Sequence, residues 1–262
     1  EYYQNALELD VQNLLKLDAD RLLAGFRETA GYAAGMSDKD IESYMKNKKR
    51  YEGGWENSLI GGHTLGHYMS AVAQGIVNPG VTAEEKEKLT ERLNYIIDAL
   101  NDCQKKTEGV NGLEGYIFGA TLPNSSFKKN VALQFDNVEK GRANIATEAW
   151  VPWYTMHKIL AGLVDSYQIA GNKTAIEVAN KLGTWIADRA NNWSSSTQST
   201  VLGIEYGGMN DALYQLYKVT DASNKEDFYK AAHHFDETSL FESVLAGSKN
   251  VLNGKHANTT IP

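Results

Sequence analysis

The sequence predicts an all-α fold built from helical hairpins, and three observations support this class. Several long segments place apolar residues at steps of three and four, which is the period of an amphipathic α-helix. Only 4 prolines occur among the 262 residues. Residues 166–172 also resemble residues 216–221, which begin 50 positions later. A helical hairpin repeated at that length is the unit of an open α/α solenoid or a closed α/α toroid.

The individual helices follow from apolar stripes and from capping signals. Thr82 and Glu85 form a capping box at the start of one helix, and Thr174 with Glu177 suggests another. The remaining stretches contain glycines and show little periodicity of apolar residues, so we expect mainly loops over residues 27–54 and 105–149. The stripes predict helices over residues 4–17, 62–77, 82–100, 153–169, 174–186, 209–217 and 228–235.

Composition excludes several classes of partner. The formal net charge of −7 argues against the phosphate backbone of a nucleic acid. No apolar run approaches the ~18 residues needed to cross a membrane. We see no signal peptide at Glu1, and the location stays open: secreted or on the cell surface if a signal was trimmed, and cytoplasmic otherwise. Cys103 is the single cysteine; it permits no internal disulfide, and we interpret it as a half-buried helix residue.

The helix that starts near residue 153 carries the first candidate site. Two tryptophans, a tyrosine and a proline precede or open it, and His157 lies in its first turns. Such a helix start is either one wall of a sugar pocket, because aromatic faces stack on sugar C–H surfaces, or simply a packed helix end.

Two further motifs place polar side chains near helix starts. His63 and His67 are four residues apart on one helix face, where they could bind a metal, face a ligand or make structural hydrogen bonds. No third metal ligand is evident nearby. Glu205 precedes two glycines and a helix; it is a candidate to hold a sugar hydroxyl or to act as a catalytic carboxylate, whereas the glycines alone suggest only a turn. His256 lies in a polar loop that is either a ligand cradle or a helix cap.

Five segments in chain order resemble the β-L-arabinofuranosidase type of glycoside hydrolase, family 127 and its sister family 146. Residues 18–27 also look like the N-terminal segment of that family. The five segments are residues 53–56 (Gly-Gly-Trp-Glu), 62–68 (Gly-His-Thr-Leu-Gly-His-Tyr), 150–163 (Trp-Val-Pro-Trp-Tyr-Thr-Met-His-Lys-Ile-Leu-Ala-Gly-Leu), 205–210 (Glu-Tyr-Gly-Gly-Met-Asn) and 256–259 (His-Ala-Asn-Thr).

The resemblance implies an (α/α)6 barrel, of which residues 1–262 form an incomplete, N-terminal portion of the catalytic domain. It also implies exo-acting removal of terminal β-L-arabinofuranosyl units from plant glycans, with retention at the anomeric carbon. The residues expected to face the sugar are His63, His157, Glu205, Tyr206 and His256, with Trp55 and Trp153 as stacking groups or pocket walls.

The resemblance further implies a cysteine nucleophile held in a zinc site with other cysteines and a glutamate, and a second glutamate as acid/base. We expect these groups to follow Pro262, so we assign no catalytic residue and no metal ligand within this chain. Two other functions stay open: a carbohydrate-binding α/α domain without catalysis, and a helical-repeat interaction module with exposed apolar patches.

Overall fold

The computed structural model describes residues 1–120 and 125–255, and over these ranges it contains helices and no strand. The all-α class is therefore confirmed. The helices are α1 (Tyr2–Lys16), α2 (Ala19–Ala33), α3 (Asp38–Tyr44), α4 (His63–Val77), α5 (Ala83–Lys105), α6 (Ser125–Lys129), α7 (Leu133–Glu139), α8 (Pro152–Gln168), α9 (Lys173–Ala190), α10 (Ser195–Leu202), α11 (Met209–Val219), α12 (Lys225–His233) and α13 (Thr238–Leu245).

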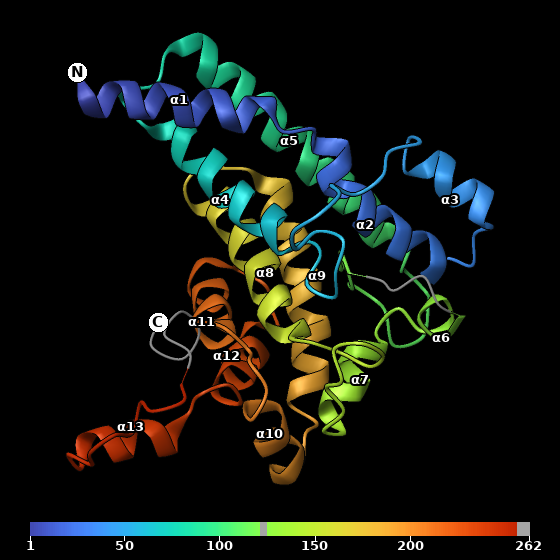
Figure 1. Ribbon diagram of the computed structural model, residues 1–262, viewed down its shortest axis with the longest axis vertical. Helices are drawn as coiled ribbons and strands as arrows, with labels where there is room; N and C mark the ends of the chain where they lie inside the picture. The colour runs from blue at the N-terminus through green and yellow to red at the C-terminus, as the bar shows by residue number, and fades with distance from the viewer. Residues whose placement is uncertain (121–124, 256–262) are drawn as a thin grey trace.

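The longer helices form two layers of hairpins (Figure 1). In the first layer α4 packs against α8, and α8 packs against α11; in the second layer α5 packs against α9, and α9 against α12. Each first-layer helix is joined by a short turn to its second-layer partner, which gives the hairpins α4/α5, α8/α9 and α11/α12. The last two are the hairpins that the sequence repeat between residues 166–172 and 216–221 predicts.

The helix starts show how the sequence fixes these boundaries. Thr82 accepts a hydrogen bond from the backbone N–H of Glu85, whose carboxylate in turn accepts from Thr82, so the predicted capping box is present. The second predicted box is wrong, because Asn172 rather than Thr174 caps α9, its side-chain oxygen accepting from the N–H of Ala175.

α4 and α8 approach each other backbone to backbone. A Cβ placed on Gly66 would lie 2.1 Å from the carbonyl oxygen of Lys158, which is far inside contact distance. Because glycine has no Cβ, the two helices can pack at this separation without displacing either backbone. This contact sets the position of the two helix ends that carry the candidate site.

The core contains a group of interlocking aromatic rings between α8, α9 and the segment 116–118. The rings of Trp153 and Phe135 lie 4.8 Å apart between centroids, and those of Tyr116 and Trp185 lie 4.7 Å apart. Residues 116–118 are buried but form no strand. The segments expected to be loops also contain short helices, namely α3, α6 and α7, together with the second half of α2.

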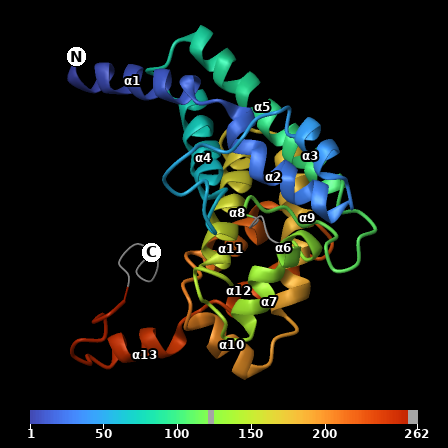
Figure 2. The same ribbon diagram turned by 45° about the vertical axis from the view of Figure 1, so that its right-hand side comes forward.

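α13 projects away from the two layers in both views (Figures 1 and 2). Its side chains Phe241, Val244 and Leu245 are exposed, and among the described residues no element packs extensively against it. Across the described part of the chain, no helix has the length and apolar character that crossing a bilayer requires.

Candidate functional site

The N-terminal ends of the three first-layer helices meet on one side of the molecule. α4 begins at His63, α8 at Pro152 and α11 at Met209. The ring of His63 lies 6.1 Å from the ring of Tyr154 in the first turn of α8, measured between centroids. The N-cap of α11, Gly208, donates its backbone N–H to a side chain of α8. Three segments that are far apart in the sequence therefore contribute to one site.

α4 and α8 run in the same direction, which explains why their first turns face each other. His63 lies beside Tyr154, and one turn further along Gly66 lies beside Lys158. The residues of the two helices thus advance together, and the polar side chains on their first turns share one end of the layer. We use the name histidine cluster for His63, His67, Tyr154 and His157.

His63 is held from one side by the loop that precedes α4. Its Nδ1 lies 3.1 Å from the carbonyl oxygen of Ile60 and 3.7 Å from a carboxylate oxygen of Glu56. Glu56 is itself buried and accepts hydrogen bonds from the backbone N–H groups of Gly62 and Thr64, so it caps the start of α4. The same carboxylate therefore closes the helix end and borders the imidazole.

His157 is held from the side of α11. Its Nδ1 accepts a hydrogen bond of 3.1 Å from the backbone N–H of Gly208. Gly207 has a left-handed φ of 63°, and a Cβ there would lie 2.6 Å from the same Nδ1. Burial, assisted by the nearby charges of Lys158 and His67, lowers the pKa of His157 to about 3, so its ring is neutral at physiological pH.

A lysine and a carboxylate lie next to the cluster. Burial lowers the pKa of Lys158, and the carboxylate of Glu205 opposes this shift. Burial also raises the pKa of the Tyr154 hydroxyl, and the same carboxylate adds to that effect. The Nζ of Lys158 lies 5.3 Å from the centroid of the Tyr154 ring, within the range of a cation–π contact.

Two tryptophans border the cluster on the side of α4. Trp55 is 55% exposed, and its ring lies 5.4 Å from that of Trp150 and 6.4 Å from that of His63. A large aromatic face that remains open to solvent beside polar side chains provides a stacking surface for the C–H face of a sugar. Together the segments offer aromatic faces, imidazole nitrogens, a phenol, an ammonium and a carboxylate at one end of the layer.

Comparison with protein families identifies the family of the chain. A family model described as Beta-L-arabinofuranosidase, GH127 catalytic domain, matches residues 1–262. The chain belongs to the GH127 family. Membership supports a glycoside hydrolase with a carbohydrate substrate, and the predicted resemblance is confirmed. A comparison with curated protein sequences gave no match.

Four of the residues that the sequence predicts to face the sugar lie at this candidate site. Trp55, His63 and His157 belong to the cluster or border it, and Glu205 is close enough to shift the pKa values of Tyr154 and Lys158. Their role in binding a sugar stays a prediction, but their juxtaposition is a property of the fold.

Two other predicted residues point elsewhere. Trp153 is 1% exposed and packs against the rings of Trp193 and Phe235, so it belongs to the core and cannot stack on a ligand. It precedes His157 by one turn of α8 and adjoins Tyr154, so the local motif did not reveal that its ring is directed into the core. Tyr206 is buried beside Phe235 and its hydroxyl hydrogen-bonds to Glu237, rather than joining the cluster. His256 lies outside the described residues.

The same motifs contain three further residues of the site that the sequence pattern did not indicate. Tyr154 joins the two histidines, Lys158 is the ammonium beside Glu205, and Gly208 supplies the hydrogen bond to His157. Tyr154 and Lys158 flank the selected residues Trp153 and His157, and the helical period would have placed them on the same polar face.

Cys103 is not part of this site. It is completely buried in α5, where the hydroxyl of Tyr44 lies 3.5 Å from its Sγ, and burial raises the pKa of its thiol to about 12. Such a thiol remains protonated and has little nucleophilic character. In residues 1–120 and 125–255, no three His, Cys, Asp or Glu side chains are arranged to hold a metal ion.

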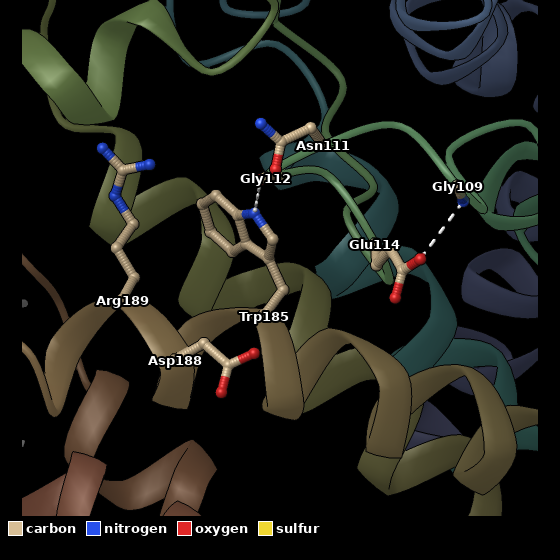
Figure 3. A pocket seen from close by; sticks show the side chains of 7 residues that line it. All are labelled: Gly109, Asn111, Gly112, Glu114, Trp185, Asp188 and Arg189. Atoms are coloured by element: carbon tan, nitrogen blue, oxygen red, sulfur yellow. Dashed lines mark hydrogen bonds between the residues drawn. The ribbon is translucent and has the colours of Figure 1, made fainter.

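A separate hollow of about 580 Å³ lies between α9 and the loop that follows α5 (Figure 3). The indole Nε1 of Trp185 donates to the carbonyl oxygen of Gly112 at 2.9 Å, which joins the loop to the helix across the hollow. None of its lining residues belongs to the histidine cluster. The lining residues are Gly109, Asn111, Gly112, Glu114, Trp185, Asp188 and Arg189.

Proposed function

We propose that this GH127 protein is a retaining, exo-acting β-L-arabinofuranosidase and that the histidine cluster binds the terminal sugar. The family match supports glycoside hydrolysis, and the sequence motifs extend it to β-L-arabinofuranosyl units of plant glycans. The observation that carries the proposal is the meeting of the first turns of α4, α8 and α11, which brings Trp55, His63 and His157 together.

The chemistry of the cluster suits a small neutral sugar. Imidazole nitrogens and a phenol can hydrogen-bond hydroxyl groups, and Glu205 can accept from a hydroxyl without needing a charged partner. Trp55 supplies an exposed apolar face beside them. A site of this kind orients a monosaccharide by several directed hydrogen bonds and one stacking contact.

The zinc-bound cysteine implied by the resemblance does not fit the described residues. Cys103 is buried away from the cluster, and the described part of the chain holds no suitable set of three metal ligands. We therefore assign substrate contacts to this chain, and we assign zinc and the nucleophile to none of its described residues.

The same observation favours a second candidate, a carbohydrate-binding α/α domain without catalysis. Such a domain would use Trp55, His63 and His157 as this proposal does, but it would not break the glycosidic bond. The two functions differ in turnover and not in binding.

Incubation of the full-length protein with a 4-nitrophenyl β-L-arabinofuranoside, with zinc supplied, separates the two functions. Release of L-arabinose, with the β-anomer detected first by NMR, would support the retaining glycosidase. Release of the α-anomer first would contradict retention. Calorimetric binding of methyl β-L-arabinofuranoside without any release would favour the second candidate, and absence of both binding and release would contradict both.

A further inference from the structure

The two best-anchored imidazoles of the cluster are held by partners of opposite character. The partner of His63 Nδ1 is the carbonyl oxygen of Ile60 at 3.1 Å, and the partner of His157 Nδ1 is the backbone N–H of Gly208 at 3.1 Å. A carbonyl oxygen can only accept a hydrogen bond, whereas a backbone N–H can only donate one. The protein backbone therefore determines which nitrogen of each ring carries the proton.

His63 must carry its proton on Nδ1, because that atom faces the carbonyl oxygen of Ile60. The carboxylate of Glu56, 3.7 Å from the same nitrogen, favours the same tautomer. In the neutral ring Nε2 then has a free lone pair and acts as an acceptor. Any hydroxyl that forms a hydrogen bond with Nε2 of His63 must therefore be the donor.

His157 must carry its proton on Nε2, because Nδ1 accepts from Gly208. Gly207 and Gly208 pack closely against the ring, since a Cβ on either would approach its nitrogens to 2.6 Å and 3.1 Å. The ring therefore lies directly against the loop that donates this hydrogen bond, and a side chain at either glycine would displace it. Any group that forms a hydrogen bond with Nε2 of His157 must therefore be the acceptor.

We propose that His63 and His157 present one acceptor and one donor to the same ligand, and so select neutral polyhydroxylated compounds over anions. This inference rests on the proposed function, because it describes how the sugar site recognises hydroxyl groups by hydrogen bonds. The ring of Tyr154 lies 6.1 Å from His63 and 6.3 Å from His157, so the two imidazoles border one aromatic ring. A sugar hydroxyl can donate to one neighbour and accept from another, whereas a carboxylate has no proton to give to His63.

The tautomers can be measured without any ligand. Long-range ¹H–¹⁵N correlation spectra of the histidine rings distinguish a protonated Nδ1 from a protonated Nε2, and the variants His63→Gln and His157→Gln assign the signals. We expect His63 to carry its proton on Nδ1 and His157 on Nε2 at pH 7. The same tautomer on both rings, or the reverse assignment, would overturn the inference.

Ligand selection is tested by calorimetry with methyl β-L-arabinofuranoside and its 2-, 3- and 5-deoxy and fluoro analogues. A fluorine cannot donate but can still accept weakly. Replacing the hydroxyl that faces His63 by hydrogen or by fluorine should weaken binding by about tenfold in each case, because one hydrogen bond of about 1.4 kcal/mol is lost. At the hydroxyl that faces His157 we expect the fluoro analogue to bind more tightly than the deoxy analogue.

The outcomes separate this inference from the proposed function. Equal losses for fluoro and deoxy analogues at every position would contradict the selection while leaving the sugar site intact. Equal or tighter binding of L-arabinonate, the matching anion, would also contradict it. If none of the arabinofuranosides binds, the proposed function fails, and the ring spectra still decide whether the two tautomers are as we infer.

Discussion

A Cβ placed on Gly162 would lie 2.5 Å from the carbonyl oxygen of Gly66. Gly66 also lies close to the carbonyl oxygen of Lys158, so α8 and α4 pack closely over two successive turns of α8. The close approach holds the first turns of both helices together, and these turns carry His63 and Tyr154. Small residues in the middle of the layer thus determine the geometry at its end.

We expect Gly162→Ala to destabilise the fold by about 1–3 kcal/mol, because overpacking outweighs the better helix propensity of alanine. Urea denaturation measures this change. Gly203→Ala is the matched control, since Gly203 has a φ of −74° and its nearest neighbour would lie 3.3 Å from the new Cβ. That control should change stability by less than about 0.5 kcal/mol. Equal effects of the two variants would show that α4 and α8 tolerate a wider separation.

The two tryptophans chosen from the sequence should behave in opposite ways. Trp153→Ala removes a ring from the core and should cost about 3–5 kcal/mol of folding free energy, measured by denaturation. Trp55→Ala removes an exposed ring and should change stability by less than about 0.5 kcal/mol. In calorimetry, however, Trp55→Ala should weaken sugar binding by about tenfold, the ratio expected from about 1.4 kcal/mol of lost stacking. Unchanged affinity would exclude Trp55 from the site.

His157 should make stability depend on pH in a defined window. Its pKa is about 3 in the folded chain and close to 6.5 when unfolded. Between these values only the unfolded chain binds the proton, so the stability is complete above pH ~6.5 and falls by up to about 1.4 kcal/mol per pH unit toward pH 3. We expect the stability of His157→Gln to fall less steeply than that of the wild type between pH 6 and pH 4. Parallel curves from denaturation at each pH would contradict the lowered pKa.

A buried arginine holds α2 against α5. Arg27 is 5% exposed, and it donates to Asp20 at 2.7 Å and to the hydroxyl of Tyr95 at 3.1 Å. Removing the guanidinium takes the closest ion-pair partner from the partly buried carboxylate of Asp20, which keeps its contacts with Tyr95 and Lys46, so we expect Arg27→Met to cost about 3 kcal/mol. The exposed Lys88, which pairs with Glu84, is the control. Lys88→Met should have a far smaller effect in the same denaturation experiment, and similar losses for both would be inconsistent with this assignment.

The helices and hairpins could be predicted because each long helix buries a stripe with a clear period. Leu65, Met69 and Val72 on α4 are completely buried, as their spacing predicts. Segments 27–54 and 105–149 were predicted less well. Residues 116–118 form no regular element, and their burial depends on distant partners such as Trp185, which no local pattern encodes.

The site was predicted in part for a related reason. Motifs at helix starts pointed to His63, His157 and Glu205, and the family resemblance added Trp55. The side-chain directions of Trp153 and Tyr206 were not predictable in the same way. Each depends on Phe235, which is far along the chain and fills the space behind both rings.

The central claim is that the first turns of α4, α8 and α11 bind one sugar, and NMR titration with methyl β-L-arabinofuranoside tests it most directly. We predict that the backbone N–H signal of Gly208 and the indole N–H signal of Trp55 shift together and saturate at the same ligand concentration. Shifts of the Trp185 indole and the Gly112 amide, with Gly208 and Trp55 unchanged, would place the ligand in the hollow beside α9 and contradict the account.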